Sequence, residues 1–215
     1  MKDLLNYKAI LWDFDGVLMD SMPIRDKGFT EVLKQYPKEQ VDELMAYHRA
    51  NGGLSRYVKF RYFFENIRKE KISEDQVLTL ANDFSGIMLQ LLINQSLLIN
   101  DSLEFVIKYH KEVPMHIVSG SDGNELRHIC GQLKIDQYFV SISGSPTPKK
   151  ILVKELLNKY KYAPEETILI GDAVNDYDAA VANEIQFAGY NNPSLLTFSN
   201  NYITLFKDLQ KKTNR

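Results

Sequence analysis

Short apolar runs recur along the chain, and each is bounded by charge, glycine or a small polar residue. They cover residues 9–12, 114–119, 139–143 and 167–170. Continuous apolar runs of this length are typical of strands buried on both faces, whereas surface strands alternate apolar and polar residues. The pattern therefore predicts four buried strands.

Apolar residues at helical spacing lie between and after these runs. They predict helices over 101–111, from 122 or 123 to 133, and over 149–160. Strand and helix in turn predict an α/β fold: a doubly wound, Rossmann-like parallel sheet with helices on both faces. In such sheets ligands bind beyond the carboxyl ends of the strands.

Residues 22–90 show a different pattern, in which helix follows helix with few β-branched runs. Ser73 and Gln76 have the spacing of a capping box, which marks a helix start. We therefore predict a small α-helical domain at 21–89, inserted into a core domain formed by 1–20 and 90–215. We interpret 88–99 as the end of the last inserted helix and the return linker, and 202–215 as one short helix with a basic tail.

The composition adds little to the predicted fold, but it restricts the classes of molecule that the protein is expected to bind. The 215 residues are 44% hydrophobic and 25% charged, which is ordinary for a globular chain. Lys and Arg number 26 against 28 Asp and Glu, a net charge of -2, so no broad basic field exists for nucleic acid or an anionic membrane. A small-molecule partner is favoured, and the composition leaves monomer and homodimer both open.

The lone cysteine, Cys130, cannot form an internal disulfide, and no segment reaches the roughly 18 uninterrupted apolar residues of a membrane span. The first residues lack the apolar run of a signal peptide. The four histidines are scattered and form no transition-metal motif. These observations predict a cytoplasmic protein without a transition-metal site.

Candidate chemistry begins where the first strand ends. Asp13 and Asp15 stand two residues apart at that end, so their side chains are expected to point the same way, and Gly16 lets the chain turn. Two like charges this close repel unless a cation lies between them or one stays protonated. Hard oxygen ligands favour Mg²⁺, so the pair predicts a magnesium site.

The next two segments offer groups for an anion. Ser-Gly-Ser at 119–121 joins a strand to a helix, where a hydroxyl and free amides can bind a phosphate. Lys149 and Lys150 lie in the first turn of a helix and oppose its dipole, which an anionic partner would explain. Lys149 shares the inward face with Leu152, whereas Lys150 faces solvent, so we choose Lys149.

The last segment, Thr-Ile-Leu-Ile-Gly-Asp at 167–172, is another apolar strand that ends in acid. Asp176 follows Asp172 after four residues. Like Asp13, these carboxylates are expected at the carboxyl edge of the sheet.

Together the segments resemble the four motifs of the haloacid dehalogenase (HAD) superfamily of phosphohydrolases, in that family's order. Asp-Phe-Asp-Gly-Val-Leu-Met-Asp-Ser at 13–21 is similar to the first motif, and the segments at 119–121, 149–150 and 171–176 are similar to the other three. The inserted helices resemble the C1-type cap of subfamily I, which includes beta-phosphoglucomutase and phosphoglycolate phosphatase. The resemblance covers about 7–21 and 100–190, and the cap only loosely.

The resemblance implies a Mg²⁺-dependent phosphatase that acts on a small phosphorylated metabolite, such as a sugar phosphate, through an aspartyl phosphate on Asp13. It makes Asp15 the acid and base, and Ser119 and Lys149 the groups that hold the phosphoryl oxygens, with Gly120 and Ser121 binding substrate. It implies that Asp13, Asp15, Asp172 and Asp176 serve the metal, with Asp176 acting directly, through water or from further away.

Two alternatives stay open at this point. One is a phosphomutase similar to beta-phosphoglucomutase, which carries a histidine about twelve residues past its nucleophile, where this chain has Arg25. The other is a non-catalytic binding module on a HAD fold, although none of Asp13, Asp15, Lys149 or Asp172 is missing.

The cap sequence offers one further candidate site. Gly-Leu-Ser-Arg at 53–56 resembles the cap loop of beta-phosphoglucomutase, whose arginine reaches toward the far end of the substrate. The resemblance predicts substrate binding by Arg56, and we add Lys59 from the same stretch. A solvent-facing arginine at a helix start is the equally weighted alternative.

Overall fold

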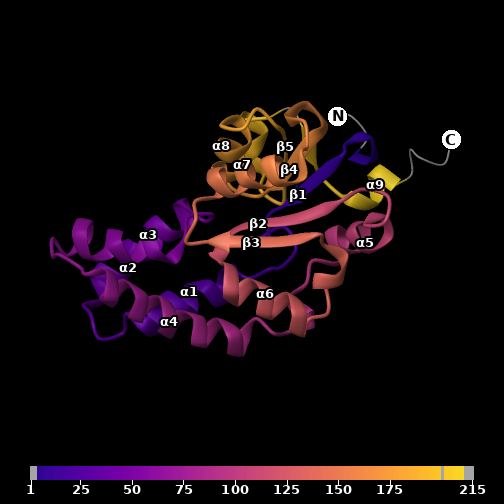
Figure 1. Ribbon diagram of the computed structural model, residues 1–215. Coiled ribbons are helices and arrows are strands. Elements are labelled where there is room, and N and C mark those ends of the chain that lie inside the picture. The colour runs from indigo at the N-terminus through magenta and orange to yellow at the C-terminus, as the bar shows by residue number, and fades with distance from the viewer. Residues whose placement is uncertain (1–3, 200, 211–215) are drawn as a thin grey trace.

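The computed structural model describes residues 4–199 and 201–210. Its centre is a six-stranded sheet in which every neighbouring pair is parallel (Figure 1). The strands, in chain order, are β1 Ala9–Trp12, β2 Met115–Asp122, β3 Ser141–Ser145, β4 Thr167–Gly171, β5 Gln186–Tyr190 and β6 Tyr202–Ile203. Their spatial order is β3-β2-β1-β4-β5-β6. The doubly wound α/β fold is thus confirmed, with β1 and β4 side by side at its middle.

Alternation along the central strands sends side chains into two separate cores. Ile10 and Trp12 of β1 pack on one face with residues of α5 Asn100–Tyr109, α6 Gly123–Gln132 and α9 Phe206–Gln210. Leu11 packs on the other face with residues of α7 Lys149–Tyr160 and α8 Val174–Val181. Because both faces are covered, the central strands are apolar throughout, as the sequence pattern predicts.

The end of the chain differs from the sequence prediction. Tyr202–Ile203 form the edge strand β6 where we expect a helix, and among the described residues from 202 onward only Phe206–Gln210 are helical. A two-residue strand has no periodicity of its own, so its pairing with β5 decides its structure. β5 is itself unanticipated, since Ala188 and Gly189 interrupt its apolar pattern. Residues 211–215 of the expected helix lie outside the described residues.

The segment after β1 forms a separate helical lobe beside the sheet (Figure 1). Phe29, Phe60 and Phe84 meet at its centre with ring centroids 4.6 to 6.3 Å apart. Ser73 and Gln76 form the expected capping box. The elements of the lobe are α1 Met22–Val32, α2 Lys38–Ala50, α3 Arg56–Tyr62, a π-helical turn Phe63–Ile67 and α4 Glu74–Leu91. The exact domain boundaries stay a prediction.

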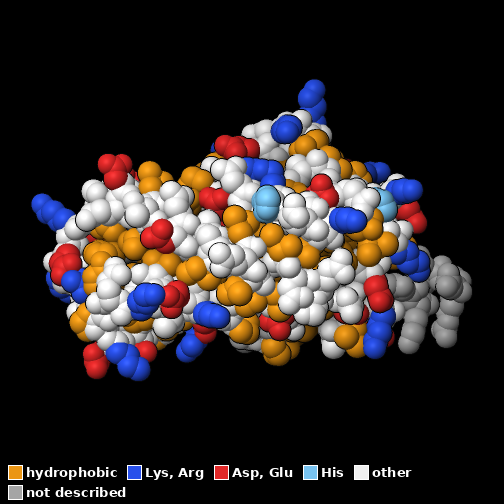
Figure 2. Space-filling model, turned by 90° about the horizontal axis from the view of Figure 1, so that it is seen from below, with side chains coloured by type: hydrophobic (Ala, Val, Ile, Leu, Met, Phe, Trp, Pro, Cys, Tyr) orange, Lys and Arg blue, Asp and Glu red, His pale blue; other side chains and the backbone are white. Residues whose placement is uncertain are grey.

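Short 3₁₀ helices connect several of these elements, at Leu4–Asn6, Gln95–Leu97, Asp136–Tyr138, Pro164–Glu166 and Pro193–Thr197. None of the helices in the described part of the chain is both long and apolar enough to cross a bilayer. On the face seen in Figure 2, acidic and basic side chains are interspersed, in keeping with the small net charge.

Candidate active site

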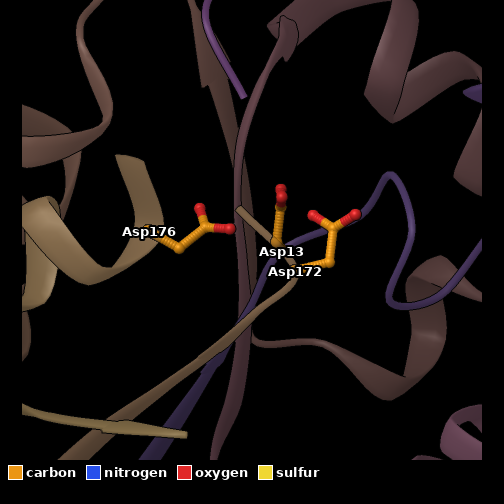
Figure 3. Close-up of side chains that lie close together, drawn as sticks. All are labelled: Asp13, Asp172 and Asp176. Atoms are coloured by element: carbon orange, nitrogen blue, oxygen red, sulfur yellow. The ribbon is translucent and has the colours of Figure 1, made fainter. Parts of the chain in front are cut away.

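Three aspartates converge at the carboxyl edge of the two central strands (Figure 3). Asp13 follows β1, Asp172 follows β4, and Asp176 lies in the first turn of α8. One carboxylate oxygen from each lies within 4.8 Å of the others. Gly16 makes the approach possible, because a Cβ there would come within 2.0 Å of the Asp172 carboxylate, and its φ of +74° also favours glycine.

Lys149 lies against this acidic cluster. Its Nζ is 2.9 Å from Asp13 Oδ1 and also contacts Asp176, and the side chain is buried. Lys150 is exposed, as the face argument predicts. Burial and the Asp176 carboxylate raise the pKa of Asp13 to about 7, against the opposing effect of the Lys149 ammonium. Two of the three carboxylates thus share the Lys149 ammonium.

The chemistry of this donor set fits a divalent cation. Carboxylate oxygens are hard ligands, and the excess of negative charge in the cluster is what such an ion would neutralise. Asp176 already uses both oxygens, one toward Lys149 and one accepting from the Ala173 amide at 3.1 Å. Asp13 and Asp172 are therefore the freer donors.

Asp15 lies outside the acidic cluster. Its Oδ1 accepts from Arg25 Nε at 2.9 Å and from the Ser21 hydroxyl, and its Oδ2 accepts from Ser121 Oγ at 2.5 Å. Burial opposes ionisation, but Arg25, Ser121 and Ser21 outweigh it and lower the pKa of Asp15. The expectation that Asp13 and Asp15 present both side chains to one ion does not describe this geometry, because Arg25 and the hydroxyls hold the second carboxylate away.

Ser119, Gly120 and Ser121 form the adjoining wall. The buried Ser119 Oγ accepts from the Ser121 amide at 3.1 Å. Gly120 lies so close to the cap that a Cβ would come within 2.1 Å of the Gly53 carbonyl oxygen. All three line the cavity beside Asp13.

The cavity has a volume of about 600 Å³ and lies between the sheet edge and the helical lobe. Two hydrogen bonds join the two parts beside it: Asn175 Nδ2 donates to the Gly53 carbonyl at 2.8 Å, and the Tyr57 hydroxyl donates to Asp122 at 2.8 Å. The lobe therefore contacts the sheet edge beside the site. A pocket of this size suits a small polar molecule.

Arg56 and Lys59 both line the cavity from the cap side. Arg56 Nη1 is 2.7 Å from Glu125 Oε2 and donates to Ser85 Oγ at 2.6 Å, and the side chain is only 4% exposed. Lys59 is 2% exposed, with Nζ 2.8 Å from His48 Nδ1 and 3.1 Å from the Gly52 carbonyl oxygen. The alternative of a solvent-facing Arg56 is thus wrong.

Comparison with known proteins agrees with this arrangement. The family model of haloacid dehalogenase-like hydrolases matches residues 10–190. The chain belongs to this family. A phosphoglycolate phosphatase from Photobacterium profundum is 26% identical over 94% of this chain and 88% of its own length. A phosphorylated carbohydrates phosphatase from Thermotoga maritima is 22% identical over 83% of this chain and 82% of its own length.

Solved structures share the fold over nearly the whole chain. The beta-phosphoglucomutase from Clostridium difficile has a TM-score of 0.75 at 18% identity and covers 97% of both chains. A predicted phosphoglycolate phosphatase from Haemophilus somnus has a TM-score of 0.76 at 20% identity and covers 97% of this chain and 99% of its own. At these identities the likeness concerns the fold.

The sequence pattern does not predict several residues of this HAD site. It marks Arg25 only as the position where the mutase resemblance calls for histidine, and it does not mark Glu125. They pair at 3.1 Å across 100 residues of sequence, so no local pattern signals them. His48 was set aside as a scattered histidine, although it continues the buried face of Val41 and Leu44 in α2, and that spacing could have placed it inward.

Proposed function

We propose that this HAD-family protein is a Mg²⁺-dependent phosphatase that hydrolyses a small phosphorylated metabolite through an aspartyl phosphate on Asp13. The observation that carries the proposal is the buried Asp13 carboxylate, which lies beside Lys149 and two further carboxylates at one end of the cavity between the sheet edge and the helical lobe. The names of the two relatives, a phosphoglycolate and a carbohydrate phosphatase, support this class of substrate. We expect it to act in the cytoplasm.

In the first step an Asp13 oxygen attacks phosphorus, and the bond from phosphorus to the leaving alcohol breaks. Asp15, whose contacts favour the ionised form, first takes up a proton from solvent and then gives it to the leaving alcohol. Lys149 neutralises charge on the phosphoryl oxygens, and the donors around Ser119 hold them. When bound, Mg²⁺ would be held by Asp13 and Asp172 and would supply further positive charge there. Asp176 orients Lys149.

In the second step water attacks phosphorus and its proton passes to Asp15, which releases phosphate and restores Asp13. The contacts of Asp15 suit this role, since Arg25, Ser21 and Ser121 favour its ionised form. The closed cap would keep other nucleophiles from the aspartyl phosphate.

Arg25 favours a hydrolase over a phosphomutase. It occupies the sequence position at which the mutase resemblance calls for histidine, and its guanidinium is committed to Asp15 and Glu125. A guanidinium stays protonated and therefore cannot serve as an acid or base. Against a binding module without catalysis stands the convergence of Asp13, Lys149 and Asp172.

The decisive experiment measures phosphate release from p-nitrophenyl phosphate and a panel of phosphorylated metabolites with Mg²⁺. We expect turnover that EDTA abolishes and Mg²⁺ restores. Asp13→Asn should lower kcat by a factor on the order of 10⁴ or more while the circular dichroism spectrum is retained, because the amide keeps the size of the nucleophile but not its charge. Wild-type turnover in that variant, or indifference to EDTA, would refute the mechanism.

A further inference from the structure

The cap side of the cavity is lined by four cations, and three of them are arginines with a carboxylate close by. Arg25 is 2.9 Å from Asp15 and 3.1 Å from Glu125. The other two pairs are Arg56 with Glu125 at 2.7 Å and Arg49 with Asp26 at 2.8 Å. Three carboxylates therefore balance the three arginines before any substrate arrives.

Glu125 is the centre of this balance. It enters from α6 of the core domain, is 3% exposed, and uses one oxygen for each of two cap arginines. An anionic group of a substrate that approached Arg56 would meet the Glu125 carboxylate as well. Arg56 is thus poorly placed to receive a second negative charge.

Lys59 differs from the three arginines. Its Nζ lies 2.8 Å from His48 Nδ1 and 3.1 Å from the Gly52 carbonyl oxygen, and no carboxylate among the described residues lies within ion-pairing distance of it. His48 Nε2 is 3.3 Å from Asp26 Oδ1. A lysine ammonium can only donate, so His48 Nδ1 accepts from Lys59 and the ring proton lies on Nε2. His48 and the Gly52 carbonyl thereby position Lys59 in the cavity wall.

Its surroundings make the charge of Lys59 depend on what the cavity holds. Burial, together with Arg25 and Arg56, lowers the pKa of Lys59 to about 7, against the opposing effect of Asp15 and Asp26. His48 and Arg49 of α2 also line this part of the cavity, and Glu125 of α6 pairs with the lining residues Arg25 and Arg56. An anion bound at Lys59 would favour the protonated ammonium.

We propose that Lys59 receives one anionic group on the leaving alcohol, so that the substrate is a phosphorylated hydroxy acid rather than a neutral polyol phosphate. This inference rests on the proposed phosphatase function and gives it a substrate class. It also moves the distal recognition role from Arg56 to Lys59, which positions the substrate and takes no part in phosphoryl transfer.

Two esters that differ only at the far end test the proposal: 3-phosphoglycerate, with a carboxylate, and glycerol 3-phosphate, with a hydroxymethyl group. The quantity to measure is the ratio of their kcat/KM values from pH 6 to 8.5 at saturating Mg²⁺. Protonation of enzyme groups that affects both esters equally cancels in this ratio. In the wild type the ratio should favour the acid and fall about tenfold per pH unit above pH 7, as the lysine loses its proton.

Variants separate Lys59 from its neighbours. Lys59→Met should lower the ratio at pH 6.5 by about tenfold or more and flatten its pH profile, since a charge-assisted hydrogen bond is lost. Lys59→Arg should restore the preference and keep it up to pH 8.5, because arginine does not lose its proton in this range. Lys38→Met removes an exposed lysine from the same domain and should leave the ratio unchanged.

Failure of the inference is distinguishable from failure of the proposed function. A flat wild-type ratio, or a loss of preference in Arg56→Gln but not in Lys59→Met, would overturn the role of Lys59 while both esters still turn over. Should Lys59→Met not fold, the wild-type profile and Lys59→Arg decide the question. If the wild type hydrolyses neither ester nor p-nitrophenyl phosphate, the phosphatase proposal itself fails.

Discussion

The two ends of the cavity differ in charge balance. At the sheet edge three carboxylates face the single ammonium of Lys149, which leaves an excess of negative charge. On the cap side three arginines are matched by three carboxylates, and only Lys59 lacks one in the described structure. An unbalanced cluster calls for a ligand of opposite charge, whereas a balanced wall fixes side chains in place. The sheet edge is thus organised for chemistry and the cap wall for selection.

Among the tests of this contrast, the largest effect is expected at the sheet edge, where negative charge is in excess. Lys149→Ala removes the only ammonium of the acidic cluster and should lower kcat by about 10²- to 10³-fold, because no other cation replaces it at the phosphoryl oxygens. Lys150→Ala is the matched control, since this neighbour is exposed and should change kcat by less than about twofold. Steady-state kinetics with p-nitrophenyl phosphate measure both. If the two variants lost activity equally, the contrast between the ends would not hold.

The same contrast explains what the sequence could predict. Asp13, Asp172 and Ser119 each end or follow their own apolar strand, and parallel strands bring their carboxyl ends to one edge, so local patterns sufficed. Helical spacing was enough to separate Lys149 from Lys150. These inferences need only the period of a strand or helix and the direction of the sheet.

The arrangement of the cap side of the cavity, formed by Arg25, Arg49, Arg56 and Lys59, cannot be predicted from local sequence patterns. Glu125 meets Arg25 and Arg56 only because the lobe closes on α6, and that geometry depends on packing between distant segments. Asp15 illustrates the same limit. Its spacing from Asp13 predicts a shared direction, yet Arg25 and Ser121 hold its carboxylate elsewhere.

An intermediate effect on kcat/KM is expected at the contact between the loop at Gly53 and Asn175 of the core. A Cβ on Gly53 would lie 1.8 Å from Asn175 Oδ1, so Gly53→Ala should displace this side chain, weaken its contact with the cap loop and lower kcat/KM about tenfold. Gly52→Ala is the control, since a Cβ there meets nothing within 4 Å. The kinetics should be measured with the best metabolite found in the substrate screen.

A second substitution makes this test specific. Asn175→Ala removes the side chain that the new Cβ would strike, so the double variant Gly53→Ala, Asn175→Ala should recover part of the lost kcat/KM. Such recovery would show that the loss comes from a blocked approach. If Gly53→Ala behaved like Gly52→Ala, closure at this contact would not position the cap wall.

The smallest expected effect is on the free energy of unfolding, through the buried His48. Burial, with Lys59 and Arg25 nearby, lowers the pKa of His48 from 6.5 to about 3, so the folded protein keeps this ring neutral while the unfolded chain protonates it below pH 6.5. The unfolded state then binds more protons. The stability that depends on neutral His48 is therefore fully present above pH 6.5 and is lost as the pH falls toward 3.

Urea unfolding at pH 6.5 and 5.5 can detect this contribution. Relative to His48→Gln, the wild type should lose about 1 kcal/mol more of its free energy of unfolding over that interval. His116, whose pKa burial lowers to about 4, contributes equally to both proteins and cancels in the comparison. The exposed His128→Gln is the matched control and should follow the wild-type curve. If wild type and His48→Gln lost equal free energy of unfolding, His48 would be protonated in the folded protein. The cavity wall beside Lys59 would then carry a further positive charge.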